Sequence, residues 1–241
     1  MATGNPTDFG AAADSYRRGR PDYPADLVGW LVNGAERVAD VGAGTGKLTG
    51  VLRGLGCAVT AIDPDPRMLA ALGTDHAEVA TAVGQGEDIP LPDASVDAVT
   101  YGQAWHWVDR TAASREAARV LTAGGALGLI WNFRDESYEW IAELTSVITP
   151  SGGEELLNSV PTLVEPPFGE VEHRSCTWTR PMTIDQVRDM VASRSYVIAA
   201  SERDRTTVLN RSVELATKVA DDAGRVTMPY RTEAYRAVLP G

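Results

Sequence analysis

The chain has 241 residues, enough for one domain with a sizeable hydrophobic core. Its formal net charge of −11 disfavours nucleic acid as a partner, and its basic cluster, Arg17, Arg18 and Arg20, is short. No apolar run approaches the roughly 18 residues that a membrane-spanning helix needs, and the first ten residues lack the pattern of a secretory signal. With two cysteines in unrelated contexts, Cys57 and Cys176, the composition favours the reducing cytoplasm.

The N-terminal segment before the first predicted strand is expected to be helical. Residues 8–33 contain a leading helix, a turn-rich stretch at 18–24, and a second helix that Pro24 opens at its first position, where proline is tolerated. We expect residues 1–34 to form a helical lid or brace.

From residue 36 to 131, short apolar runs alternate with helix-like stretches, which is the pattern of β-α-β units around a parallel sheet. The runs are rich in Val, Ile and Leu, as expected for strands covered on both faces. The predicted strands are 37–41, 58–63, 78–83, 96–101 and 126–131. The predicted helices run from the glycines after residue 41 to about 55, from 64 or 65 to just before Gly73, and from 109 to about 121, with Gly124 and Gly125 as a helix stop.

After residue 131 the pattern is less regular. We expect a helix to about 148, a loop at 149–153, an extended segment at 171–178, helices at 184–193 and 205–220, and a strand at 230–238 with one buried face. One domain is predicted for residues 1–241: a core at 35–134, a helical elaboration on the substrate side at 135–225, and a final strand at 226–241.

The first predicted strand runs directly into the sequence DVGAGTGK at residues 40–47, and open α/β sheets bind ligands at such glycine turns. A phosphate-binding P-loop would need glycine at position 41 and Ser or Thr at position 48, where this chain has Val and Leu, so that interpretation fails. A dinucleotide fingerprint would place its third glycine at position 47, which is lysine. The spacing weakens an NAD(P)-binding interpretation without excluding it.

The glycine-rich sequence, with acidic Asp40 two residues ahead of Gly42, resembles motif I of the class I S-adenosylmethionine-dependent methyltransferases. Three further segments are similar to that family, in the same order: VTAIDPD at 59–65, GQGEDIPLPDASVD at 84–97 and RVLTAGGAL at 119–127. Residues 9–16 and 20–24 more loosely resemble small-molecule members of the methyltransferase type 11 group, and the nearest branch is the one with trans-aconitate methyltransferase-like proteins.

This resemblance implies a Rossmann-like, doubly wound α/β sheet, mostly parallel with an antiparallel strand near the C-terminus, in the strand order 3-2-1-4-5-7-6. It also implies S-adenosylmethionine as the cofactor. Asp63 would accept hydrogen bonds from both ribose hydroxyls, although such an acid also suits NAD. Met68 would pack against adenine, with a plain core position as its alternative. The cofactor-binding residues expected from the resemblance are Tyr16, Arg20, Asp40, Gly42, Ala43, Gly44, Asp63, Pro64, Met68, Gly86, Glu87 and Gln103.

Aromatic and polar groups follow the fourth and fifth predicted strands, at the edge of the sheet where ligands are expected. The predicted substrate-binding residues are Trp105, Trp107, Trp131 and Arg134. His106 is the predicted catalytic residue, because a neutral imidazole can take a proton from a hydroxyl or an amine. The alternatives are that Trp105 and Trp107 brace the loop, that His106 is structural, and that Arg134 and Arg20 are surface arginines rather than anchors for a carboxylate.

Transfer of a sulfonium-activated methyl group is an in-line attack that depends mainly on alignment and on exclusion of water. Neither a metal nor a catalytic triad is expected, and no cluster of His, Cys and acidic residues has ligand spacing. We therefore predict O-, N- or C-methylation of a small molecule, with no nucleic-acid or membrane partner. One alternative is an NAD(P)-dependent oxidoreductase, disfavoured because lysine occurs only at 47 and 218 and no Tyr-x-x-x-Lys pair exists. The other is a non-catalytic binding protein that retains the fold.

Overall fold

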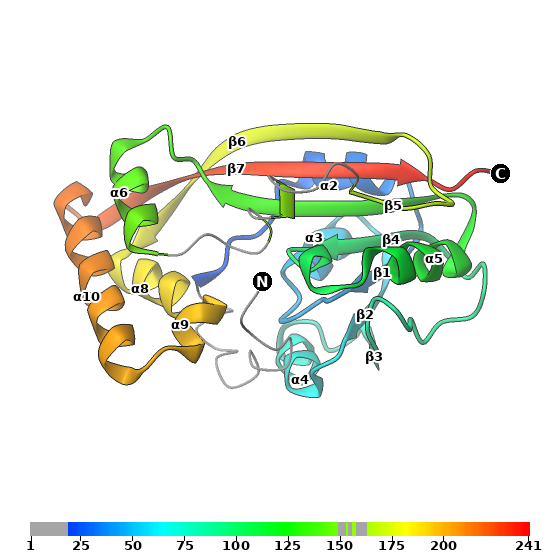
Figure 1. The fold of residues 1–241 in the computed structure, drawn as a ribbon, viewed down its shortest axis with the longest axis horizontal. Helices are drawn as coiled ribbons and strands as arrows, with labels where there is room; N and C mark the ends of the chain where they lie inside the picture. The colour runs from blue at the N-terminus through cyan, green and yellow to red at the C-terminus, as the bar shows by residue number, and fades with distance from the viewer. Residues whose placement is uncertain (1–18, 149–152, 154–155, 158–162) are drawn as a thin grey trace.

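The computed structural model describes residues 19–148, 153, 156–157 and 163–241 (Figure 1). In this part of the chain, seven strands form one sheet in the order β3-β2-β1-β4-β5-β7-β6, which confirms the predicted Rossmann-like topology. Five of them are parallel: β1 (Arg37–Val41), β2 (Ala58–Asp63), β3 (Ala80–Val83), β4 (Val96–Gly102) and β5 (Leu121–Arg134). The antiparallel strands β6 (Val171–Thr183) and β7 (Arg225–Val238) extend the sheet beyond β5.

Helices cover both faces of the sheet, because successive side chains of a buried strand point to opposite sides. On one face lie α2 (Ala25–Val32), α3 (Lys47–Gly54) and α4 (Pro66–Asp75), and on the other lies α5 (Arg110–Val120). Helix α2 approaches β5 closely, since a Cβ on Gly128 would lie 2.6 Å from Leu31 Cγ. Helix α2 is thus packed directly on the sheet; the predicted lid or brace over residues 1–34 stays a prediction.

A second group of helices has its own hydrophobic cluster. It contains α6 (Glu139–Val147), α8 (Ile184–Ala192), α9 (Ser195–Ala199) and α10 (Glu202–Val219). Leu144, Val187, Met190 and Leu215 from these helices pack with Met228 of β7. In Figure 1 this group lies beside the carboxyl ends of β4 and β5. The helices after β5 therefore face the edge of the sheet at which ligands are expected.

The prediction that Gly124 and Gly125 stop a helix is wrong. Helix α5 ends at Val120 and the chain enters β5 at once, so both glycines lie inside this strand. The register of β4 and β5 shifts between Val96 and Ala98, and Gly124 has φ of +76°. The glycines therefore lie at a strand irregularity, where Gly124 adopts positive φ without strain because it has no Cβ.

Other boundaries also differ from the predicted ones. Helix α4 continues through Gly73 to Asp75, with Asp65 as its N-cap, and Pro24 is the N-cap of α2 rather than its first residue. Strand β3 begins at Ala80, two residues later than predicted, while β6 and β7 extend each other well past the predicted segments. Helix α10 begins at Glu202, and α9 was not predicted. The predicted leading helix and the loop at 149–153 lie outside the described residues, except that Gly153 is helical.

Within the described ranges, no helix has both the length and the apolar character needed to cross a bilayer. The same residues contain no group of three or more His, Cys or acidic side chains arranged to hold a metal ion.

Candidate active site

The glycine turn between β1 and α3 has a backbone that other residues rarely adopt. Gly42, Gly44 and Gly46 have φ of +69°, +56° and +88°, where glycine avoids the clash that a Cβ would cause. A Cβ on Gly42 would also lie 2.5 Å from the Cβ of Ala104, in the loop after β4. Strands β1 and β4 are neighbours at the point where the strand order reverses, so the two loops meet where such sheets bind ligands.

Asp63 lies at the carboxyl end of β2 and is held against this turn. Its Oδ2 accepts a hydrogen bond from the Gly44 N–H at 2.8 Å, and its Oδ1 accepts one from the Asp65 N–H at 2.9 Å. The residue is 7% exposed, and burial raises the pKa of Asp63 against the opposing effect of these two bonds. Each carboxylate oxygen can accept a further bond, so Asp63 is oriented and still able to bind a hydroxyl.

Asp40 lies beneath the turn rather than at its surface. It is fully buried, and its two oxygens accept hydrogen bonds from the hydroxyls of Thr49 on α3, at 2.6 Å, and Thr100 on β4, at 3.3 Å. Burial raises the pKa of Asp40 to about 6 in spite of these bonds. Asp40 therefore joins β1, α3 and β4 and holds the turn in place; a contact of Asp40 with the cofactor stays a prediction.

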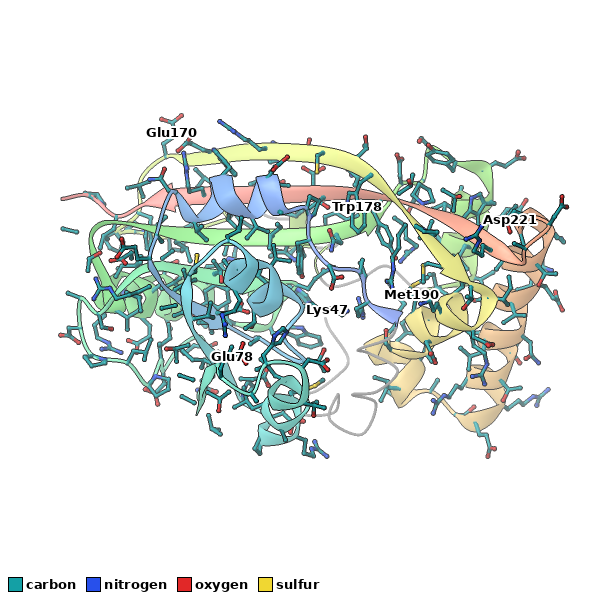
Figure 2. All side chains as sticks on the ribbon, turned by 180° about the vertical axis from the view of Figure 1, so that it is seen from behind. Lys47, Glu78, Glu170, Trp178, Met190 and Asp221 are labelled. Atoms are coloured by element: carbon teal, nitrogen blue, oxygen red, sulfur yellow. The ribbon has the colours of Figure 1, made fainter. Side chains whose placement is uncertain are left out.

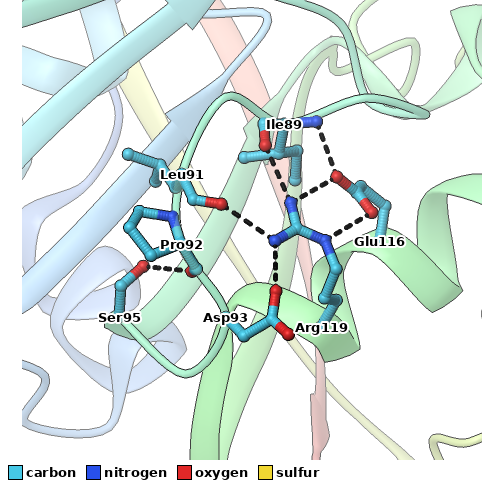
Figure 3. Close-up of polar contacts among 7 residues, drawn as sticks. All are labelled: Ile89, Leu91, Pro92, Asp93, Ser95, Glu116 and Arg119. Carbon is cyan, nitrogen blue, oxygen red and sulfur yellow. Dashed lines mark hydrogen bonds and ion pairs between the residues drawn. The ribbon is translucent and has the colours of Figure 1, made fainter.

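The loop after β3 is fastened to α5 by Arg119 (Figure 3). Its guanidinium donates to the carbonyl oxygens of Ile89 and Leu91, each at 2.9 Å, and to the carboxylates of Asp93 and Glu116. Glu116 in turn accepts the Ile89 N–H at 2.9 Å, and hydrogen bonding to Arg119 lowers the pKa of Glu116. The planar fork of arginine suits this set of acceptors.

The fastened loop brings Gly86 and Glu87 against the loop after β4. A Cβ on Gly86 would lie 2.7 Å from Val108 Cγ1, so a larger residue would separate the two loops. Glu87 Oε1 accepts the Asp109 N–H at 2.7 Å. Both residues are therefore positioned beside the loop after β4; their role in binding the cofactor stays a prediction.

The loop after β4 carries Gln103 and His106. The side chain of Gln103 donates to the Asn132 carbonyl at 2.9 Å, which ties this loop to β5. His106 lies in the short 3-10 helix η2 (Trp105–Trp107), and within the described part of the chain its buried Nδ1 has no hydrogen-bond partner. Burial, together with the positive charge of Arg20, lowers the pKa of His106 to about 4. The imidazole is thus neutral at pH 7.

The tryptophans occupy different environments. Trp105 is fully buried, contacts Tyr101 edge-on with 4.7 Å between ring centroids, and donates its indole N–H to the Leu163 carbonyl at 2.9 Å. This position favours the bracing role for Trp105. Trp107 is half-buried, with its ring centroid 5.1 Å from that of His106. Trp131 is fully buried, and among the described residues its Nε1 has no partner.

Arg134 is not a surface arginine, because it is 7% exposed at the end of β5. Its Nη2 lies 3.5 Å from Thr145 Oγ1 of α6. Arg20 is half-buried, and its guanidinium donates to the hydroxyl of Ser193 at 3.1 Å and to the Ser193 carbonyl at 3.3 Å. Both arginines therefore point toward the second group of helices.

The remaining predicted residues have simpler surroundings. The Ala43 N–H donates to the Ile62 carbonyl at 3.0 Å, Pro64 is half-buried, and Met68 is buried on α4. Tyr16 lies outside the described residues. The stretch before α2 is tied to the site by Asp22, whose carboxylate pairs with Lys47 at 3.1 Å (Lys47 is labelled in Figure 2).

Sequence reasoning missed several polar residues of this region. The Thr45 hydroxyl, in the glycine turn, is buried and has no partner in the described chain; its place inside motif I was the available signal. Arg119 lies inside a family motif, but no role was predicted for it. No local sequence pattern indicated that Tyr230, Arg180 and Arg194 belong to this region. Their positions depend on strand pairing and helix packing between distant segments.

Comparison with known sequences identifies relatives over most of the chain. A family model described as a methyltransferase domain matches residues 39–129. An uncharacterized methyltransferase of Mycobacterium tuberculosis is 44% identical over 234 residues, covering 96% of this chain and 95% of that protein. An uncharacterized methyltransferase-like protein of Schizosaccharomyces pombe is 27% identical, covering 91% of each.

Solved structures agree on the fold. A putative type II methyltransferase of Anaeromyxobacter dehalogenans is similar with a TM-score of 0.72 at 24% identity, covering 92% of this chain and 99% of that one. Phosphoethanolamine N-methyltransferase 2 of Haemonchus contortus, solved with S-adenosyl-L-methionine, is similar with a TM-score of 0.56 at 15% identity, covering all of this chain and 61% of that one. Because the 44% match spans nearly the whole chain and the topology agrees, the chain belongs to the class I S-adenosylmethionine-dependent methyltransferases.

Proposed function

We propose that the protein transfers the methyl group of S-adenosylmethionine to a small-molecule acceptor at the carboxyl edge of the sheet. The observation that carries the proposal is the contact between the glycine turn and the loop after β4. Gly42 meets Ala104 so closely that no side chain fits between them, and His106 follows two residues later. A donor on the turn and an acceptor near His106 would therefore be neighbours.

The residues of the turn fit the cofactor. The positive-φ glycines expose backbone to the amino-acid end of the donor, and the unpartnered Thr45 hydroxyl adds a polar group there. Asp63 would bind the ribose hydroxyls with the acceptor capacity that Gly44 and Asp65 leave on it. The cofactor supplies a methyl group activated by its sulfonium. The residues that we propose to hold the cofactor are the cofactor-binding residues expected from the resemblance. Asp40 would contribute by holding the turn from beneath.

His106 would take a proton from a hydroxyl or amine acceptor, or orient the acceptor through a hydrogen bond. Its lowered pKa keeps the ring neutral, and its buried Nδ1 has an unmet hydrogen-bonding capacity within the described chain. Alignment of the two reactants would contribute on the order of 7 to 11 kcal/mol to lowering the barrier. Trp107 and Arg134 complete the proposed acceptor side, with Trp131 behind them.

The setting we propose is cytoplasmic, with neither nucleic acid nor membrane as partner. The net charge of −11 opposes binding to polyanions. Cys57 and Cys176 are both free thiols, which suits a reducing compartment. Placement in the trans-aconitate methyltransferase-like branch stays a prediction.

The cofactor is tested by calorimetric titration of the full chain with S-adenosylmethionine, S-adenosylhomocysteine and NADH. We expect binding of the first two, and a preference for NADH would overturn the proposal. Acceptors are then screened with labelled methyl donor across hydroxy, carboxy and amino metabolites. With a hydroxyl or amine acceptor, His106→Gln should lower kcat by about 10²- to 10⁴-fold and leave S-adenosylhomocysteine binding unchanged. His173→Gln, on β6, is the matched control.

A further inference from the structure

Tyr230 of β7 carries a buried hydroxyl that the proposed methyl transfer does not explain. The residue is 3% exposed, and within the described ranges its Oη has no hydrogen-bond partner. Its ring stacks on Trp178 of β6, with 5.0 Å between centroids and 23° between planes. Because buried hydroxyls in proteins are nearly always hydrogen-bonded, this oxygen is positioned for a ligand atom.

Four arginines lie within electrostatic reach of this hydroxyl. The described charges that act on Tyr230 come from four arginines in four separate segments, and together they oppose the effect of burial, which raises the pKa of Tyr230. The four are Arg20 before α2, Arg134 at the end of β5, Arg180 in β6 and Arg194 between α8 and α9. Such a concentration of guanidinium groups is notable in a chain whose net charge is −11.

Strand register and hydrogen bonds hold the arginines on the sheet side. Arg134 lies directly opposite Tyr230 in the β5–β7 register. Arg180 follows Trp178 by two residues, and Trp178 is opposite Tyr230 in the β6–β7 register. The guanidinium of Arg180 also donates to the Gly19 carbonyl at 3.1 Å. The sheet extension is thereby fastened to the stretch that carries Arg20.

The helical side is fastened to the same stretch. A Cβ on Gly19 would lie 2.4 Å from the Met190 backbone nitrogen, so the backbone at Gly19 lies directly against α8. Arg20 donates to Ser193, and the next residue, Arg194, is 6% exposed. Figure 2 labels Trp178 on β6 and Met190 on α8, which mark the strand side and the helix side of this region.

Arg20 links the arginine cluster to the proposed methyl-transfer site through its charge. The charge of Arg20 acts on His106 as well as on Tyr230, so the two residues lie within electrostatic reach of one arginine. His106 in turn follows Ala104, which contacts the glycine turn. An acceptor with one end near His106 could therefore place its other end among the arginines.

We propose that Tyr230, Arg20, Arg134, Arg180 and Arg194 bind an oxyanion of the methyl acceptor, so that the substrate class is a carboxylate or a phosphate monoester. The proposal rests on the proposed methyltransferase function. Guanidinium forks match the geometry of carboxylate and phosphate groups, and the phenol hydroxyl adds a donor. The anion anchors the acceptor while its reacting atom lies near His106.

The experiment measures anion binding by the full chain through thermal unfolding, with inorganic phosphate and malonate titrated at constant ionic strength against sodium chloride. We expect a saturable rise in Tm with phosphate, malonate or both. The anion that binds more tightly indicates whether the acceptor carries a phosphate monoester or a carboxylate. Tyr230→Phe, which keeps the ring on Trp178, should raise the half-saturating concentration about tenfold, as expected when one hydrogen bond to a charged group is lost. Arg180→Gln should do the same, whereas Tyr235→Phe on the same strand should not.

Several results would overturn the proposal: no saturation with either anion, equal protection by chloride, or unchanged anion binding in both Tyr230→Phe and Arg180→Gln. If Tyr230→Phe does not fold, Arg180→Gln alone decides. Binding of S-adenosylhomocysteine is measured in the same preparations. If it binds normally while the anions do not, only the acceptor class is wrong; if it fails to bind, the proposed methyltransferase function fails independently.

Discussion

Gly42→Ala tests the close approach on which the proposed site depends. At φ of +69°, a left-handed conformation costs an alanine about 1 to 2 kcal/mol. The new Cβ would lie 2.5 Å from Ala104 Cβ, well inside the roughly 3.5 to 4.0 Å at which carbon atoms pack, and overpacking of this kind costs about 1 to 3 kcal/mol. We therefore expect the free energy of unfolding to fall by about 2 to 5 kcal/mol.

A double-mutant cycle separates the two contributions. Ala104→Gly removes the methyl group that the new Cβ meets. Combined with Gly42→Ala, it should therefore recover the stability lost to overpacking, while the stability lost to the left-handed backbone conformation remains lost. The expected coupling energy is about 1 to 3 kcal/mol. Gly73→Ala is the control, because Gly73 lies in α4 and a Cβ added there would have no neighbouring atom within 4 Å; it should stabilise the protein by about 0.5 to 1 kcal/mol.

The assay is urea unfolding of the four proteins of the cycle and of the control, with calorimetric titration of S-adenosylhomocysteine on each. Gly42→Ala should also weaken cofactor binding, because the displaced turn no longer holds Gly44 against Asp63. Additive effects of the two substitutions, or wild-type stability of Gly42→Ala, would refute the steric reasoning. Normal binding in a destabilised Gly42→Ala would refute the assignment of the turn to the cofactor.

Asp63→Asn should weaken S-adenosylhomocysteine binding by about 1 to 3 kcal/mol in calorimetry, since a charged acceptor is lost; unchanged affinity would contradict its ribose role. Arg119→Lys should lower Tm, because an ammonium cannot reproduce the guanidinium fork, whereas Arg211→Lys, at an exposed pair with Glu214, should not. The folded-state pKa of His106, about 4, lies below its ordinary 6.5, so the unfolded chain gains its proton first and stability falls as pH drops from 6.5 to 4. His106→Gln should flatten that part of a Tm-against-pH curve; an unchanged slope would show that His106 does not titrate this way.

Local patterns were sufficient for the β-α-β core of the fold, whereas the strand order came from the family resemblance. Parallel strands covered on both faces read as apolar runs, and their spacing by helices implies β-α-β units, so β1 to β4 were predicted closely. The glycine turn could also be predicted from the local sequence, because the ability to adopt positive φ is a property of the individual glycine residues. Gly124 and Gly125 show where this reasoning fails, since a helix stop and a strand bulge use the same residue for the same backbone freedom.

The candidate site was determined only in part by the sequence. Gly42, Asp63 and His106 follow the ends of strands, and parallel strands bring those ends to one edge, so their proximity could be predicted. The burial of Trp105 and the four-acceptor arrangement around Arg119 depend on packing between elements, which a linear pattern does not encode.

The grouping of Tyr230 with its arginines depends on tertiary structure alone. Arg20 and Tyr230 are more than two hundred residues apart, and the register of β5, β7 and β6 together with the seating of Gly19 on α8 brings them together. Short-range periodicity identifies which residues form strands and turns. Long-range pairing decides which charges meet, because that choice is set by the free energy of the whole packed chain.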